Sequence, residues 1–276
     1  MSRSNSQFSD MGSQVEDAFM KYASPVKPYI PTISRFLLVV TFFEDALRII
    51  MQWSEQNSYM KYSRGFPSFT SQIFLGLNVI VMLVCSTLAV QRRYTEYAVG
   101  GLATVVVSQA LGYGMIFDFK FVLYNFSILG GLLLLLSENM LAKRKAVFAG
   151  LPSVGQVEQS TYILLAGRIL LLFLFLGFIF AGEFTFARMI VSAIGLVACF
   201  MVAIGFKAKW SALFMVLFLS IINVFINNWW SLSEHHFERD HIKYDFFQTL
   251  STVGGFLLLV SVGPGGLSMD EKKKAL

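Results

Sequence analysis

Eight stretches of about 20 predominantly apolar residues run along the chain, and they restrict its fold more than any other feature. Each is long enough to cross a bilayer as a helix, which satisfies its own backbone hydrogen bonds in lipid. With 55% hydrophobic and only 14% charged residues, the composition excludes an ordinary soluble domain. We therefore predict an all-α polytopic membrane protein. The predicted spans are residues 33–52, 69–90, 97–117, 119–137, 161–181, 185–206, 209–229 and 245–263.

The even number of spans places both termini on the same side of the membrane. Basic residues are concentrated in the short loops on that side, among them Arg92, Arg93, Lys143 and Lys207. Such loops are typical of the cytosolic face, so we predict cytosolic termini. The junction between the third and fourth spans, around Asp118, is almost too short for a loop, and a re-entrant kink is the alternative there.

The two halves of the chain resemble each other. Ser127-Ile-Leu-Gly-Gly-Leu in the fourth span matches Ser251-Thr-Val-Gly-Gly-Phe in the eighth, and Arg35 in the first span matches Arg168 in the fifth. A repeat with four spans per half must be parallel, which predicts two parallel four-helix repeats at 32–138 and 161–263, joined by a cytosolic linker at 139–160. Chance similarity between leucine-rich helices is the alternative.

Two cytosolic tails flank these repeats. The amino-terminal tail, residues 1–31, contains a segment at 14–22 that could form a short amphipathic helix on the membrane or remain disordered. The carboxyl-terminal tail, residues 264–276, ends in a lysine run followed by Ala275 and Leu276. Lys273 and Lys274 resemble the dilysine signal that coatomer reads on cytosolic tails of endoplasmic reticulum proteins. A basic anchor after the last span is the alternative.

Several classes of function find no support in the sequence. No basic stripe interleaved with aromatic residues is present, so we predict no nucleic-acid partner. Cys85 and Cys199 both lie in apolar runs, and the three histidines do not have the spacing of zinc hydrolases. We therefore predict no catalytic residue, no metal site and no cofactor, and expect that the chain is not an enzyme.

Charged residues inside the first span are the best candidates for function. Glu44, Asp45 and Arg48 lie in its middle and lumenal half, where an unpaired charge costs about 2.5 to 3.5 kcal/mol. Glu44 and Arg48 are spaced i,i+4, which predicts a pair on one helical face and leaves Asp45 for another partner. A purely structural ion pair is the alternative. Arg35 and Arg168 lie nearer the cytosolic ends of their spans and are expected to snorkel to lipid phosphates.

Other polar and aromatic residues are predicted at the same lumenal level. Together with the three charged residues they would form an acidic, aromatic vestibule for a hydrophobic peptide that carries a cationic amine. Ordinary interfacial anchoring by tryptophan and tyrosine is the alternative. The further candidates for cargo binding are Gln52, Trp53, Asp118, Lys120, Tyr244, Asp245 and Gln248.

Several of these motifs match a known family. Thr41-Phe-Phe-Glu-Asp-Ala-Leu-Arg48, Asp118-Phe-Lys-Phe121, Ala203-Ile-Gly-Phe-Lys-Ala-Lys209 and Lys243-Tyr-Asp-Phe-Phe-Gln-Thr249 together resemble the surfeit locus protein four family, over roughly residues 30–276. The resemblance implies a receptor that binds soluble lumenal secretory proteins and packages them into COPII vesicles for transport from the endoplasmic reticulum to the Golgi. It would then return with coatomer through Lys273 and Lys274.

A lipid or small-solute transporter, or a scramblase, is the alternative function. It would need polar residues at the membrane midplane of both halves, for which Asn125, Arg168 and Asn223 are the available candidates. The expected partners are lumenal secretory cargo proteins, the COPII coat, coatomer and membrane lipids. The sequence names neither the cargo nor the coat-binding residues, and it leaves open whether the chain forms a homo-oligomer.

Overall fold

The computed structural model describes residues 28–146, 154–173, 186–233, 238–263 and 265–269. Eight of the described helices have at least 18 residues, and each overlaps one of the eight predicted apolar stretches, although α7 begins at Val154, within the predicted linker. The part of the predicted fifth span beyond residue 173 lies outside the described residues, as do the segment 14–22, Lys273 and Lys274. The long helices are α2 (Ile30–Met51), α4 (Ser68–Val90), α5 (Thr95–Tyr113), α6 (Phe119–Ala146), α7 (Val154–Leu171), α9 (Phe186–Ile204), α10 (Ala208–Ile226) and α11 (Arg239–Val262).

Short helical turns join some of these helices. After α2 the chain forms α3 (Trp53–Ser58) and a π-helical turn, η1 (Tyr59–Ser63); the 3-10 turns η2 (Met115–Phe117) and η3 (Trp229–Ser231) precede α6 and α11. Gly114, at φ +70°, ends α5, and the Asp118 carboxylate accepts a hydrogen bond from the Phe121 N–H at 3.1 Å. The junction near Asp118 is therefore a tight turn between two complete helices, not a re-entrant kink.

By length and apolar composition alone, four described segments are able to cross a membrane: Ser68–Val90, Phe121–Lys143, Ala208–Ser231 and Arg239–Val262. Met189–Ile204 is a shorter apolar helix. The prediction of an all-α polytopic membrane protein is confirmed. α2 falls outside this group because it carries four charged residues, of which Arg35, Glu44 and Asp45 are buried inside the protein and Arg48 is partly buried.

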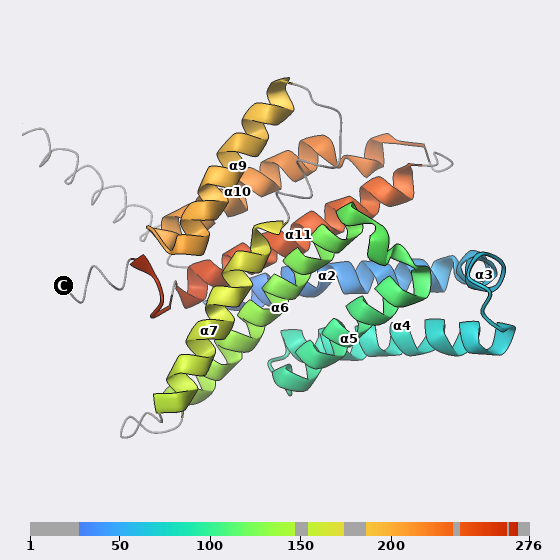
Figure 1. The fold of residues 1–276 in the computed structure, drawn as a ribbon, viewed down its shortest axis with the longest axis horizontal. Coiled ribbons are helices and arrows are strands. Elements are labelled where there is room, and N and C mark those ends of the chain that lie inside the picture. Colours follow the sequence, from blue (N-terminus) through green and yellow to red (C-terminus); the bar gives the residue numbers. More distant parts are fainter. Residues whose placement is uncertain (1–27, 147–153, 174–185, 234–237, 264, 270–276) are drawn as a thin grey trace, which may run out of the picture.

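The helices of the two halves pack in corresponding ways. α4 contacts α2 and α5, and α5 contacts α6; in the second half α9 contacts α7 and α10, and α10 contacts α11. The halves meet where α11 packs on α2 and where α6 packs on α7. The pairs α4–α5 and α9–α10 consequently lie on opposite sides of a central group made of α2, α6, α7 and α11 (Figure 1).

Two glycines make equivalent close contacts at these two interfaces. A Cβ atom at Gly254 in α11 would lie 2.4 Å from the backbone N of Leu38 in α2. A Cβ atom at Gly130 in α6 would lie 2.9 Å from the carbonyl O of Gly167 in α7. In each case only glycine allows the backbones to approach this closely. The glycines occupy corresponding positions of the repeated sequence, so α2–α11 and α6–α7 are equivalent interfaces.

We call the end of the bundle where α11 finishes the tail end, and the opposite end, where α2 finishes and α11 begins, the cluster end. Near the tail end Arg35 is 1% exposed; it forms an ion pair with Glu138 and donates to the Ala89 carbonyl at 3.4 Å. Arg168 is equally buried and donates to the Leu267 carbonyl at 3.2 Å. The prediction that both arginines snorkel was wrong, because protein groups enclose and bind them.

Candidate functional site

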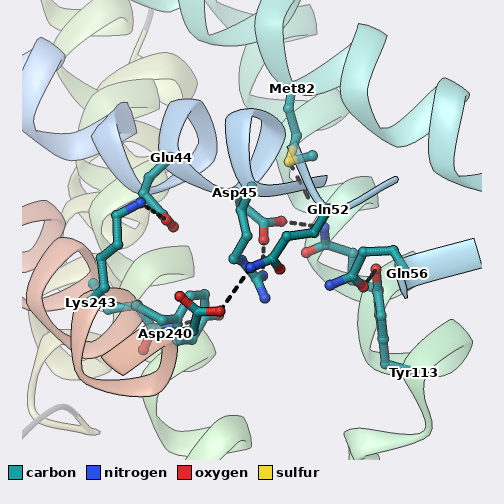
Figure 2. A network of polar contacts seen from close by, with 12 residues as sticks. Glu44, Asp45, Gln52, Gln56, Met82, Tyr113, Asp240 and Lys243 are labelled. Carbon is teal, nitrogen blue, oxygen red and sulfur yellow. Dashed lines mark hydrogen bonds and ion pairs between the residues drawn. The ribbon is translucent and has the colours of Figure 1, made fainter. Parts of the chain in front are cut away.

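The last turns of α2 carry Glu44, Asp45 and Arg48 at the cluster end, where α2 packs on α11; Figure 2 shows the two carboxylates. Glu44 and Asp45 are each 5% exposed, so both carboxylates are shielded from lipid. Burial of a carboxylate without a partner would be strongly unfavourable, and each acid has one. The partners come from different helices, so the acids join separate parts of the fold.

Glu44 pairs with a lysine from the other half of the protein. The Lys243 Nζ atom, in α11, lies 3.2 Å from Glu44 Oε1. Among the described residues, Glu44 Oε2 has no hydrogen-bond partner. The prediction that Glu44 pairs with Arg48 was therefore wrong, because α11 supplies a cation that helical spacing within α2 could not reveal.

Asp45 has two partners. One carboxylate oxygen forms an ion pair with Arg48 at i,i+3, and the other accepts a hydrogen bond from Gln109 Nε2 at 2.5 Å. Gln109 belongs to α5 and also contacts Met82 in α4. Sequence analysis missed Gln109, although a glutamine inside an apolar span is a signal that could have identified it.

Tyr244 and Gln248 of α11 complete the site. We call the whole set the α2–α11 cluster: Glu44, Asp45, Arg48, Gln109, Lys243, Tyr244 and Gln248. The Arg48 guanidinium lies 5.5 Å from the centre of the Tyr244 ring, within the range of a cation–π contact. Gln248, 1% exposed, donates from Nε2 to the Tyr244 hydroxyl at 2.6 Å. Its Oε1 is buried without a hydrogen-bond partner among the described residues.

A rim of polar and aromatic residues surrounds this cluster. Gln52 donates to the Asp240 carboxylate at 2.8 Å and thereby links the end of α2 to the start of α11 (Figure 2). Lys243 also lies 5.6 Å from the Trp229 ring, which Arg239 approaches at 5.5 Å. Asp240 and Arg239 were not predicted as site residues, because nothing in the sequence showed that the first turn of α11 lies beside the end of α2.

The remaining predicted residues lie elsewhere. Trp53, in α3, faces α4, where its ring would be 3.9 Å from a Cβ atom at Gly76. Asp118 caps α6 and is exposed, and Asp245 is half-buried in α11 next to Tyr244. Lys120 lies in the first turn of α6, but its side chain is outside the described part of the protein. Of the predicted residues, the structure therefore brings together Glu44, Asp45, Arg48, Gln52, Tyr244 and Gln248.

The distribution of charge in the cluster differs from the predicted acidic vestibule. Two carboxylates face two cations, so the formal charges of Glu44, Asp45, Arg48 and Lys243 cancel. The cations are the accessible members: 28% of the Arg48 side chain and 30% of the Lys243 side chain are exposed, against 5% for Glu44. An incoming ligand would therefore meet the cations first, with the carboxylates behind them.

The matching sequence positions of the other half do not repeat the four charged residues of the cluster. By the match of Arg35 to Arg168, the positions that correspond to Glu44, Asp45 and Arg48 are Gly177, Phe178 and Ala181. By the match of Gly254 to Gly130, Lys243 and Gln248 correspond to Phe119 and Tyr124. In sequence, the four charged residues of the cluster thus have uncharged counterparts in the other half, although Tyr244 corresponds to Lys120.

Comparison with known proteins finds a family that matches almost the whole chain. The model of the SURF4 family matches residues 9–276. The chain belongs to the SURF4 family. No solved structure matches it.

Three curated relatives in the SURF4 family have similar lengths. The surfeit locus protein 4 homolog of Schizosaccharomyces pombe is 45% identical over 97% of this chain and 89% of the relative. The homolog of Drosophila melanogaster is 41% identical, over 95% of this chain and 96% of the relative. The ER-derived vesicles protein ERV29 of Saccharomyces cerevisiae is 39% identical, over 99% of this chain and 90% of the relative.

Proposed function

We propose that this protein is a cargo receptor of vesicles derived from the endoplasmic reticulum, with the α2–α11 cluster as its cargo site. The name of the yeast relative, an ER-derived vesicles protein, supports the compartment. The single observation that carries the site is the asymmetry between the two equivalent interfaces. Four charged side chains meet at the α2–α11 interface, whereas the matching sequence positions in the other half hold none of these charges, so helix packing alone gives no reason for them.

In this proposal the cluster end faces the lumen and the tail end faces the cytosol. The excess of basic residues in the predicted tail-end loops supports this orientation. Soluble secretory proteins would then bind at the cluster end, the COPII coat would package the complex, and coatomer would return the empty receptor through Lys273 and Lys274. No catalytic step is part of this function.

The ion pairs suggest how cargo is held. A cationic group on a hydrophobic cargo segment competes with Lys243 for Glu44, whose second oxygen has no partner among the described residues. The displaced lysine remains near the Trp229 ring, which it already contacts. Exposed aromatic groups at the rim, such as Trp230, then receive the apolar side chains of the cargo.

A transporter or scramblase finds less support. Asn125 donates to the Phe121 carbonyl at 2.8 Å, and Asn223 donates to the Phe246 carbonyl at 3.0 Å. The candidate midplane amides therefore satisfy nearby backbone groups, which is a structural use. They do not form a polar path in the part of the chain that is described.

The test is cargo export by the Glu44→Gln, Asp45→Asn double variant, compared with Glu55→Gln, an exposed carboxylate near the same end. Loss of a charged partner in an interface costs about 2 kcal/mol or more, roughly thirtyfold in affinity. We expect the double variant to enter vesicles but to leave its cargo in the endoplasmic reticulum, and Glu55→Gln to export cargo normally. Normal export by the double variant would make the cluster structural only.

A further inference from the structure

After α11 ends at Val262, the chain folds back onto the bundle at the tail end. We call the described residues 265–269 of this segment the strap. Within the strap, Ser268 is only 1% exposed, as a residue in a protein core would be. The Arg168 guanidinium, in α7, donates to the Leu267 carbonyl at 3.2 Å. The strap is therefore seated on the bundle and is held there through its main chain.

Two glycines allow the strap to lie this close to the helices. A Cβ atom at Gly265, in the strap, would lie 2.3 Å from Leu164 Cδ2 in α7. A Cβ atom at Gly205, in the turn between α9 and α10, would lie 2.5 Å from Ser268 Cβ. Gly265 has a φ of +75° and Gly205 a φ of +78°, which glycine adopts without strain. The seat of the strap thus depends on the absence of a side chain at both positions.

The turn between α4 and α5 in the first half has a matching backbone. Arg92 and Gly205 both have a positive φ, and each donates its N–H to the carbonyl three residues earlier, at 3.4 Å and 3.1 Å. Tyr94 and Lys207 follow two residues later, are also left-handed, and immediately precede α5 and α10. Arg92 in the first half therefore stands where the second half has Gly205.

The first half fills this corner with charged side chains instead. Glu138 pairs with Arg35, and its Oε1 atom also lies 3.6 Å from Arg92 Nη2. In the second half Arg168 corresponds to Arg35, but the apolar Val262 corresponds to Glu138. A carbonyl of the strap, not a carboxylate at that position, binds Arg168. Because a neutral carbonyl holds a guanidinium less strongly than a carboxylate does, the strap can leave its seat more readily than Glu138 can leave Arg35.

We propose that the strap is a releasable contact that limits the reach of the retrieval signal at Lys273 and Lys274. The inference rests on the proposed function, in which coatomer reads these two lysines. With the strap seated, Lys273 extends at most about 14 Å from Met269. Once the strap is released, the chain is anchored at Gly263, and the same lysine extends up to about 35 Å from that point.

This difference in reach decides which form coatomer binds. A coat subunit has to enclose the lysine side chains beyond the lipid headgroups, and the headgroup layer alone is roughly 5–8 Å thick. The seated strap leaves little of its reach for that purpose, whereas the released strap leaves most of it. Coatomer therefore binds the released form, and Arg168 acts as a positioning residue for the signal.

Coatomer binding to the detergent-purified full-length protein tests this, first with a released strap. Ser268→Lys places a larger, cationic side chain at a buried position next to the Leu267 carbonyl that Arg168 binds, and should release the strap. Met269→Lys adds the same charge at the next position, which is 44% exposed, and is the matched control. Since the seat contains one hydrogen bond to a charged group, we expect Ser268→Lys to bind coatomer roughly tenfold more tightly than Met269→Lys.

A second variant locks the strap in its seat. Thr161 Cγ2, in α7, lies 3.7 Å from the place of a Cβ atom at Gly266, so the Thr161→Cys, Gly266→Cys pair is close enough to form a disulfide. Peptide mapping distinguishes this bond from one that involves Cys85 or Cys199. The oxidised protein should bind coatomer about tenfold more weakly than the same protein after reduction, because its released form is no longer available. Thr161→Cys alone, treated with the same oxidant, is the control and should not change.

The outcomes separate this inference from the retrieval step on which it rests. Equal binding by the oxidised and reduced proteins, tighter binding by the oxidised protein, or equal binding by Ser268→Lys and Met269→Lys would each overturn the role of the strap and leave retrieval intact. Absence of binding by every form would overturn both. The Lys273→Ser, Lys274→Ser variant gives the background level. None of these assays contains cargo, so the cargo site is not at issue in them.

Discussion

At the scale of single residues, two of the buried ion pairs in this protein join helices that are distant in sequence. Glu44 on α2 meets Lys243 on α11, and Arg35 on α2 meets Glu138 on α6. Removing one member of a buried pair leaves the other charge uncompensated, which costs more than the pair itself contributes. The pairs therefore hold α2 in register with both neighbours.

Lys243→Ala should accordingly destabilise the protein by roughly 3 kcal/mol, because Glu44 stays buried without its cation. The double variant Glu44→Gln, Lys243→Met should recover most of that loss, since neither charge remains. Thermal unfolding of the detergent-purified protein measures the stability of both variants. Lys61→Ala, at an exposed position, is the control and should have the stability of the unchanged protein. A double variant less stable than Lys243→Ala would show that the charges themselves are not the cause.

The contacts of individual side chains were also the feature that the sequence predicted least completely. The i,i+4 spacing predicted the wrong partner for Arg48, since i,i+3 is equally accessible on a helix and Asp45 occupies it. Gln109, in α5, and Asp240, in the first turn of α11, join the site through tertiary contacts alone. No local pattern encodes such contacts. The positions of the acids within α2 were nevertheless enough to locate the cluster.

At the scale of helices, the α2–α11 contact depends on the absence of a side chain at Gly254. A Cβ atom there would lie 2.4 Å from the Leu38 backbone, which cannot move aside as the end of a flexible side chain could. The helices must separate, and the pairs between Glu44 and Lys243 and between Arg48 and Tyr244 would lengthen. Helix packing and the candidate site are therefore coupled.

We expect Gly254→Ala to lower stability by about 1–3 kcal/mol and to impair cargo export. Gly100→Ala is the matched control, because a Cβ atom there has no atom within 4 Å and α5 should gain about 0.5–1 kcal/mol from the better helix former. Thermal unfolding measures the stability of both variants, and an export assay measures how well each exports cargo. Two variants of equal stability would contradict the close contact.

At the scale of the whole molecule, the eight apolar stretches predicted the long helices well, since hydrophobic length is a property of the sequence itself. Both the SURF4 family and the all-α polytopic membrane fold are confirmed. The repeat boundaries, the orientation in the membrane and the tail signal remain predictions. The acids in α2 located the site, but the sequence could not show that Glu44 pairs with Lys243, because that lysine lies in the other half of the chain.

The proposed orientation predicts that Lys273 and Lys274 are read in the cytosol. Changing both to serine should move the steady-state protein from the endoplasmic reticulum toward the Golgi, because coatomer would no longer return it. Fluorescence microscopy of the tagged protein measures the shift, with Lys61→Ser as a control at the opposite end. Unchanged residence in the endoplasmic reticulum would remove the retrieval proposal without affecting the cluster.

The central claim is that cargo binds at the α2–α11 cluster, and site-specific crosslinking tests it most directly. A photoreactive residue is placed at Gln52, beside the cluster, or at the exposed Tyr97 near the tail end, and a secretory cargo peptide is added to the full-length protein. The account predicts crosslinks from position 52 that disappear in the Glu44→Gln, Asp45→Asn background, and none from position 97. Crosslinks of equal strength from both positions, or none from position 52, would contradict it.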